Sequence, residues 1–144
     1  MSNLFTVHLV SWHNGEPLLR EIREAVFIQE QGVAPNLEWD GLDETSQHVL
    51  ALSANGDGIG CGRIAPDGKI GRIAVLPAWR RKRVGSAILE AVLDYAHSRD
   101  YQVLELNAQI AAVKLYQRYN FTEVGEEFLD ADRSEERRVG KECA

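Results

Sequence analysis

The segment 70–99 constrains the fold more than any other part of the chain. It contains an apolar run, Ile73–Leu76, which ends at Pro77 and is typical of a strand buried inside a sheet. Four consecutive basic residues, Arg80–Arg83, separate this run from a predicted helix. The helix is predicted because apolar residues repeat at helical spacing and form one stripe: Val84, Ala87, Ile88, Ala91, Val92 and Tyr95. The order is therefore strand, basic turn and helix.

A basic turn before a helix N-terminus is suited to binding a polyphosphate. The first N–H groups of a helix lack intrahelical partners, and the positive end of the helix dipole attracts anions. Gly85 lets a ligand approach the backbone because it has no Cβ. The patterns of a dinucleotide fold and of a P-loop are both absent. We therefore expect a cofactor phosphate site, with a localisation or nucleic-acid patch as the alternative for the same basic run.

This loop resembles the acetyl-coenzyme A pyrophosphate loop of GNAT-family N-acetyltransferases, written [RQ]-x-x-G-x-[GA]. Arg80 and Gly85 match its first and last positions, and Arg83 replaces its first glycine. Arg83 keeps a backbone N–H and adds a guanidinium that can contact phosphate. The resemblance implies cofactor binding along the whole loop, by Arg80, Arg81, Lys82, Arg83, Val84, Gly85, Ser86 and Ala87.

A second segment, 112–121, resembles the family's A-x-x-x-Y-x-x-x-G-F motif. Ala112, Tyr116 and Phe121 match, and Asn120 replaces the glycine. Asn is the residue that best tolerates the left-handed conformation of a helix-ending glycine, so the substitution preserves the backbone geometry.

A third resemblance lies upstream, in 26–31, 38–43 and His48, which are similar to the N-terminal half of small bacterial members. The resemblance as a whole covers roughly 4–128, with the three segments in the family's order. The resemblance implies one N-acetyltransferase domain over 1–132. Its fold class is α/β (α+β), the GNAT acyl-CoA N-acyltransferase fold, with a central twisted mixed sheet flanked by helices on both faces.

Length, charge and cysteine content agree with a single enzyme domain. A chain of 144 residues can bury one sizeable core. A net charge of −6 disfavours general nucleic-acid binding, which requires an excess of Lys and Arg. We expect no signal peptide and no membrane span, because no apolar run approaches the required length. Cys61 and Cys143 lie far apart with no metal-ligand spacing, so we expect no metal and a reducing, cytoplasmic location.

Patterns of apolar residues and turn signals predict the remaining elements. These are a strand over 5–12, a turn at 14–15, a helix over 16–31, a long polar connection over 32–46, hairpin strands over 47–53 and 59–65, a strand over 102–108, a helix over 110–119 and a strand over 121–128.

The C-terminal segment 133–144 departs from this pattern. Seven of its twelve residues are charged, and it lacks the alternation of a strand, so we expect no strand there. The resemblance implies instead a last strand, antiparallel to the preceding one. We infer that this atypical charged tail is not the family's native ending.

The resemblance implies transfer of an acetyl group from acetyl-CoA to a primary amine of a small molecule or peptide, by direct attack in a ternary complex. A lysine-like amine has a pKa of about 10.4, so a base or a water chain must remove its proton. The family's geometry implies backbone contacts from Ala74 and Val75 to the pantetheine arm and the thioester. Tyr116 is the candidate acid for the departing thiolate, or else a half-buried helix residue whose hydroxyl only finds a partner.

The other candidate residues keep two interpretations each. Glu30 is the best candidate for the general base, or a solvated surface carboxylate, with Asp43 and His48 as further candidates. Asn107 holds the cofactor's amides or caps the sheet edge. An acidic cluster around Trp39 attracts a cationic amine or is a solvated loop; its members are Glu38, Asp40, Asp43 and Glu44.

A non-catalytic alternative uses the same fold. A protein that retains the coenzyme A site could sense acyl-CoA or a partner without turnover, and the Arg83 substitution keeps this alternative open. The expected ligands are acetyl-CoA and an amine acceptor whose identity the sequence does not select. Nucleic acid and membrane are not expected partners, and a homodimer is possible.

Overall fold

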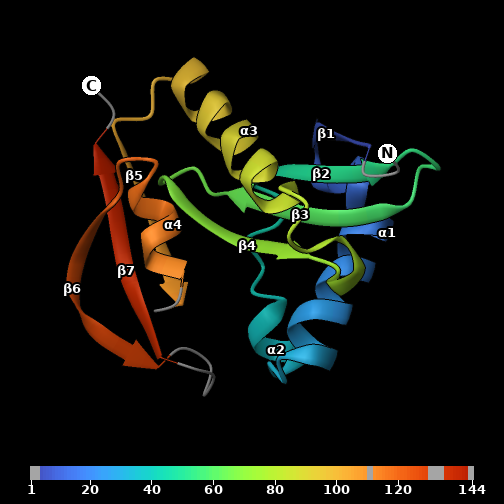
Figure 1. Ribbon diagram of the computed structural model, residues 1–144, viewed down its shortest axis with the longest axis horizontal. Coiled ribbons are helices and arrows are strands. Elements are labelled where there is room, and N and C mark those ends of the chain that lie inside the picture. The colour runs from blue at the N-terminus through green and yellow to red at the C-terminus, as the bar shows by residue number, and fades with distance from the viewer. Residues whose placement is uncertain (1–3, 110–111, 130–134, 143–144) are drawn as a thin grey trace.

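Seven strands of the computed structural model form one sheet in the order β1-β2-β3-β4-β5-β7-β6 (Figure 1). The structure describes residues 4–109, 112–129 and 135–142. Along the chain the elements are β1 (Phe5–Val10), α1 (Trp12–Arg23), the π-helical segment η1 (Glu24–Glu30), α2 (Pro35–Glu38), β2 (Gln47–Ser53), β3 (Gly58–Ile64), β4 (Lys69–Val75), the 3-10 turn η2 (Pro77–Trp79), α3 (Val84–Ser98), β5 (Val103–Gln109), α4 (Val113–Gln117), β6 (Thr122–Leu129) and β7 (Glu135–Glu142).

The sheet is mixed, and its only parallel pair among the described strands, β4 with β5, is very short. Strands β1 to β4 pair antiparallel, as do β5, β7 and β6. Between β4 and β5 the register holds only at Lys69 with Glu105 and at Ile70 with Leu106. Beyond these positions the two strands diverge, as Figure 1 shows. The sheet therefore opens into a wedge along its centre.

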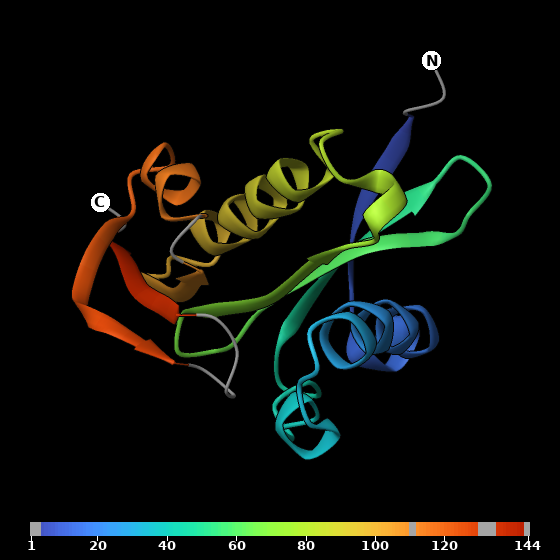
Figure 2. The same cartoon turned by 60° about the horizontal axis from the view of Figure 1, so that its bottom comes forward.

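Helices cover both faces of the sheet, which confirms the predicted architecture. In Figure 2, α1 lies on one side of the strands and α3 on the other. The side chains of β2 alternate between the two cores, because Val49 and Ala51 join the cluster under α3 whereas Leu50 joins the cluster under α1. None of the helices within the described ranges is long and apolar enough to span a membrane.

Two glycines of β3 bring α3 close to the sheet. A Cβ on Gly60 would lie 2.8 Å from Cδ1 of Ile88, and one on Gly62 would lie 2.9 Å from Cγ2 of the same residue. Ile88 is fully buried, as the predicted apolar stripe of this helix requires. The close approach fixes the position of α3, and its N-terminus follows the basic loop.

The predicted turn at Asn14–Gly15 is wrong, because α1 already begins at Trp12. Ser11 is the N-cap, and its Oγ accepts a hydrogen bond from the Asn14 N–H at 3.1 Å. Gly15 serves packing instead of a turn, since a Cβ there would lie 2.8 Å from Cγ2 of Val10. The predicted helix over 16–31 is α1 followed by η1, and the predicted connection contains the short helix α2.

The prediction that 133–144 forms no strand is wrong for its described part. Strand β7 lies between β5 and β6 and pairs antiparallel with both. Ladder pairing uses the N–H and C=O groups that almost every residue carries, so a charged segment can occupy this place. Val139 supplies an apolar anchor, since it is fully buried. Because the pairing depends so little on side chains, the inference that the segment is not the native ending stays a prediction.

Candidate active site

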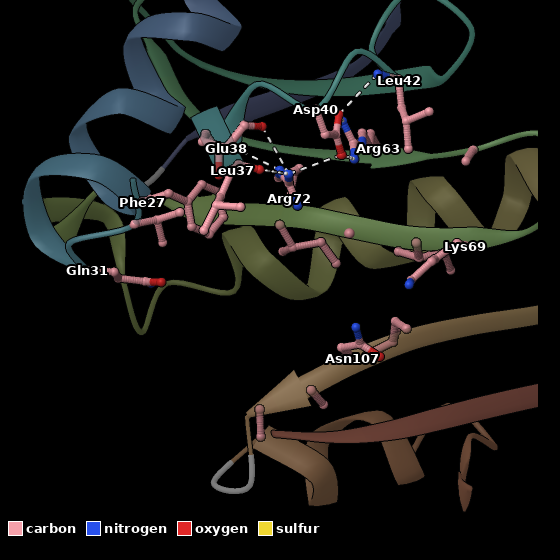
Figure 3. A pocket seen from close by; sticks show the side chains of 18 of the residues that line it. Phe27, Gln31, Leu37, Glu38, Asp40, Leu42, Arg63, Lys69, Arg72 and Asn107 are labelled. Atoms are coloured by element: carbon pink, nitrogen blue, oxygen red, sulfur yellow. Dashed lines mark hydrogen bonds and ion pairs between the residues drawn. The ribbon is translucent and has the colours of Figure 1, made fainter. Parts of the chain in front are cut away.

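A pocket of about 440 Å³ lies where β4 and β5 diverge (Figure 3). One wall consists of Asn107 and Ala108 from β5, followed by Ala112 and Tyr116. The centre of β4 lines it at 71–73. The opposite wall comes from η1, α2, the segment after α2 and β3, through Phe27, Gln31, Leu37, Glu38, Asp40, Leu42 and Arg63. The pocket therefore joins the wedge in the sheet to the N-terminal helices.

Strand β4 bulges at the pocket. Cys61 pairs with Ala74, but Arg63 pairs with Gly71, so β4 has one more residue than β3 over this stretch. Arg72 has φ +53°, in the left-handed region that side chains rarely adopt. A bulged residue is left out of the ladder and bends its strand. The bulge thus contributes to the divergence of β4 from β5 and exposes backbone groups to the pocket.

The loop 80–83 leads into an uncapped helix. No side chain caps α3, and among the described residues its first N–H group with a main-chain hydrogen bond is that of Ala87, which donates to Arg83 O at 3.1 Å. Arg81 and Arg83 have φ +63° and +68°. The second value explains why the family motif has glycine at this position, where Arg83 keeps the same backbone at a steric cost.

Arg80 binds a residue of η1 and the end of β4. Its Nε donates to Val75 O at 2.9 Å, and its two terminal nitrogens donate to the Glu30 carboxylate at 2.8 and 2.6 Å. These hydrogen bonds lower the pKa of Glu30 and raise the pKa of Arg80. The structure thus places Glu30 beside the basic loop as an ionised carboxylate, and not in the lining of the pocket.

Tyr116 and Asn107 meet at the same pocket, and Glu38 and Asp40 of the predicted acidic cluster lie in its opposite wall, whereas Glu30, Ala74, Val75 and the loop 80–87 do not line it. The Tyr116 ring is half-buried and contacts Phe121 edge-on, with ring centroids 6.1 Å apart. Asn120 has φ +69°, which confirms the left-handed conformation predicted for it. Ala74 is buried beneath α1. Four residues of the loop and helix line a second hollow at the α3 N-terminus: Lys82, Arg83, Ser86 and Ala87.

Six charged side chains beside the pocket form a closed ring of ion pairs, which we call the charge ring. Its members in order are Arg23, Glu38, Arg72, Asp40, Arg63 and Asp43. Every carboxylate lies between two arginines, and every arginine lies between two carboxylates, with N–O distances from 2.5 to 3.2 Å. Three carboxylates of the predicted acidic cluster, Glu38, Asp40 and Asp43, are therefore paired with arginines, whereas the fourth, Glu44, is exposed and lies outside the ring.

The carboxylates of the charge ring are poor candidates for a general base. Burial alone would raise the pKa of Asp40, but hydrogen bonds from Arg63 and from the Leu42 N–H lower it to about 2. Burial alone would likewise raise the pKa of Asp43, but the hydrogen bonds and charges of Arg23 and Arg63 lower it. Both groups are ionised at neutral pH and committed to ion pairs.

His48 and Cys61 are structural. Burial lowers the pKa of His48, whose Nε2 donates to Asp43 O at 2.8 Å and whose ring centroid lies 5.3 Å from that of Trp12. The histidine is thus neutral and does not line the pocket. Burial raises the pKa of Cys61 to about 12, so its thiol is not a nucleophile at neutral pH.

Sequence reasoning missed the three arginines of the charge ring. Arg63 lies in β3 and Arg72 in β4, two neighbouring inner strands of the sheet, and Arg23 is fully buried in α1. A charged residue in a buried strand requires a buried partner, which is the one signal that could have indicated the ring. The partner itself cannot be read from spacing, because Arg72 and Asp40 are 32 positions apart.

Comparison with known proteins agrees with this architecture. The family model described as acetyltransferase (GNAT) domain matches residues 21–132. The uncharacterized N-acetyltransferase YjcF of Bacillus subtilis is 35% identical over 114 residues, which cover 76% of this chain and 81% of YjcF.

Solved structures share the fold at lower identity. Escherichia coli ElaA has a TM-score of 0.84 and 24% identity, over 96% of this chain and 100% of ElaA. A GNAT family acetyltransferase from Elizabethkingia anophelis with acetyl-CoA bound has a TM-score of 0.71 and 19% identity, over 96% and 98% of the two chains. Since the family model spans most of the sequence and the fold agrees, the chain belongs to the GNAT acetyltransferase family.

Proposed function

We propose that the protein is an N-acetyltransferase that transfers an acetyl group from acetyl-CoA to a primary amine of a small molecule or peptide. The observation that carries this proposal is the pocket in the wedge between β4 and β5, which brings the bulge of β4 together with Tyr116 and Asn107. Two substrates bound side by side in one pocket favour direct attack in a ternary complex, in which positioning lowers the barrier.

The residues at the α3 N-terminus fit the diphosphate of coenzyme A. The helix is uncapped, four cations precede it, and Gly85 is not required by packing, because a Cβ there would lie 3.8 Å from its nearest neighbour, Cγ2 of Val75. We propose that the backbone N–H groups of 83–86 and the cations of 80–83 hold the phosphates. The backbone of Ala74 and Val75 and the amide of Asn107 would then hold the pantetheine arm.

Acetyl-CoA would supply the activated acetyl group, and the chain would supply positioning and a proton. A backbone N–H of the β4 bulge is suited to polarise the acetyl carbonyl, because the bulge leaves the ladder with β3. We propose that the Tyr116 hydroxyl donates its proton to the departing thiolate, since a phenol of pKa about 10 can protonate a thiolate whose thiol has a pKa of about 8.5.

The general base stays the least supported assignment. Glu30 remains our prediction, although its ion pair with Arg80 lowers its basicity and places it outside the pocket lining. A water chain that leads from the amine to solvent is the alternative already anticipated from the chemistry. Replacing Glu30 with Gln tests this, because loss of a base lowers kcat and changes its pH profile.

An acyl-CoA sensor is the second candidate. It is favoured by the carboxylates of the pocket wall, Glu38 and Asp40, which are both held by arginines and so do not serve as a base. A sensor would bind acetyl-CoA with the same residues and would release no thiol.

The test compares wild type with Tyr116→Phe. Acetyl-CoA binding is measured by calorimetry, and thiol release is measured on a panel that contains a polyamine, an amino acid, an aminoglycoside and a peptide N-terminus. We expect equal affinity in both proteins and a loss of turnover of about 10²-fold or more in the variant. The control is Tyr95→Phe, because Tyr95 lies on α3 and its ring packs against that of Tyr101, away from the pocket. Binding without turnover on any amine would support the sensor, and absence of binding would refute both proposals.

A further inference from the structure

The bulge of β4 and the segment that follows α2 are tied together by one side chain. We propose that Arg72 is a positioning residue, whose guanidinium, held in the charge ring, fixes the β4 bulge and residues 37–43 as a single wall of the pocket. This proposal rests on the proposed function only in taking the pocket as the place where the amine acceptor binds.

The contacts of Arg72 converge on one short stretch of chain. Its Nη2 donates to Leu37 O at 3.1 Å, to Glu38 O at 3.0 Å and to Asp40 Oδ2 at 3.2 Å. Its Nε lies 3.1 Å from Glu38 Oε2, an ion pair that lacks hydrogen-bond geometry. Figure 3 shows the Arg72 side chain between Glu38 and Asp40, on the side of β4 that is turned away from β5. A single planar guanidinium thus spans both ends of this stretch.

The backbone of Arg72 requires such an anchor. Its φ of +53° is unfavourable for a residue with a Cβ, and such a conformation persists only when the surroundings hold it. The side chain that is held by 37–43 belongs to the residue that carries the strain. Release of the guanidinium would therefore let β4 relax toward a regular strand and close the wedge.

The charge ring makes this anchor rigid. Arg23 and Glu38 are almost completely buried, and removing one partner from a buried ion pair leaves a charge without compensation. The most exposed side chains of the ring are Arg72 at 24% and Asp40 at 27%, and both line the pocket. The buried part of the charge ring is therefore held at α1, and its two most exposed members, Arg72 and Asp40, lie at the bulge.

We therefore expect residues 37–43 and the β4 bulge to change conformation together. A shift of 37–43 would be transmitted to the backbone groups at 72 and 73, and loss of the guanidinium would free both segments at once. A side chain with only a local role would affect its own strand alone.

Hydrogen–deuterium exchange of the full chain tests this without knowledge of the acceptor. In Arg72→Gly the left-handed backbone is allowed but the guanidinium is gone. We expect amide exchange in both 36–43 and 70–75 to accelerate by about tenfold, the size typical of coupling within an ion-pair network. Arg72→Lys should not restore protection, because an ammonium cannot replace the planar fork. The control is Arg99→Ala, which removes an exposed arginine at the C-cap of α3, outside the charge ring and away from 36–43 and 70–75.

A second variant tests the same proposal if Arg72→Gly does not fold. Asp40→Asn weakens the partly exposed end of the charge ring, and it should accelerate exchange in 70–75 as Arg72→Gly does. The double variant should show no further acceleration, because both changes break the same connection. Acetyl-CoA, used as the probe, should bind both variants more weakly than wild type, because the wedge that holds its pantetheine arm would close, and KM for an active amine should rise.

Two results would overturn the proposal. One is wild-type exchange at 70–75 in Arg72→Gly or in Asp40→Asn. The other is full additivity of the two changes. Neither result depends on turnover, so a failure of the proposed enzymatic function would be recognised separately, by the absence of thiol release in the wild type.

Discussion

Replacement of Gly85 by Ala should change stability and cofactor affinity in opposite directions. Gly85 lies in the first turn of α3, and a Cβ there would meet no atom closer than 3.8 Å. Ala is favoured over Gly in a helix by about 1 kcal/mol, so the free energy of unfolding should rise by up to that amount. For a chain of this length the melting temperature should rise by about 2–4 °C.

Affinity for acetyl-CoA should fall in the same variant. A methyl group on residue 85 occupies the space through which a phosphate oxygen would reach the backbone N–H groups. Each charge-assisted hydrogen bond that is lost weakens binding by about 1.5–3 kcal/mol, which is about tenfold to a hundredfold. Scanning fluorimetry without ligand measures the first effect, and calorimetric titration with acetyl-CoA measures the second.

A matched substitution separates helix propensity from ligand contact. Asp94 is exposed in the same helix, and Asp94→Ala should also stabilise the protein while it leaves affinity unchanged. Wild-type affinity in Gly85→Ala would show that the diphosphate does not lie against the α3 N-terminus. A marked fall in its melting temperature would show that the packing argument around Gly85 is incorrect.

Two further predictions concern the backbone at Arg83 and the burial of His48. Because Arg83 has φ +68°, Arg83→Gly should raise the free energy of unfolding in urea by about 0.5–1 kcal/mol, while acetyl-CoA affinity falls through loss of one cation; an unchanged or lower stability would contradict the strain. Burial lowers the pKa of His48 in the native protein. Below about pH 6.5, His48 therefore binds a proton in the unfolded chain but not in the native protein. The His48 contribution to the free energy of unfolding should therefore be fully present above that pH and should fall by at most about 1.4 kcal/mol per pH unit below it. His48→Gln should remove this contribution to the pH dependence of stability.

Local signals account for most of what the sequence predicted correctly. The loop at 80–87 and its helix follow from neighbouring residues, because a proline, a run of cations and an apolar stripe each act within a few positions. The left-handed conformation of Asn120 follows from the glycine of the resembled motif, together with the tolerance of Asn for that conformation. Tyr116 and Asn107 were selected by resemblance, and the structure brings them to one pocket.

Errors arose where a local signal met a competing contact. Asn14–Gly15 has the composition of a turn, but the hydroxyl of Ser11 caps a helix at that point and Val10 requires the small residue. The charge ring could not be predicted from the sequence for a different reason. Arg23 bonds Glu38 across 15 positions and Asp43 across 20, and no periodicity relates such distant residues.

The narrow contact between β4 and β5 has a consequence for how the protein holds together. Among the residues that the structure describes, only two ladder pairs join the four strands β1–β4 to the three strands β5–β7, so the backbone hydrogen bonds that make a sheet cooperative are nearly interrupted at its centre. The core under α3 then supplies most of the cohesion across this seam. A molecule lodged in the wedge would touch both halves, and ligand at a hundred times its Kd would add about 2.7 kcal/mol to stability. If acetyl-CoA occupies the wedge as proposed, it would connect the two halves of the sheet, and the free energy of unfolding would rise with its concentration.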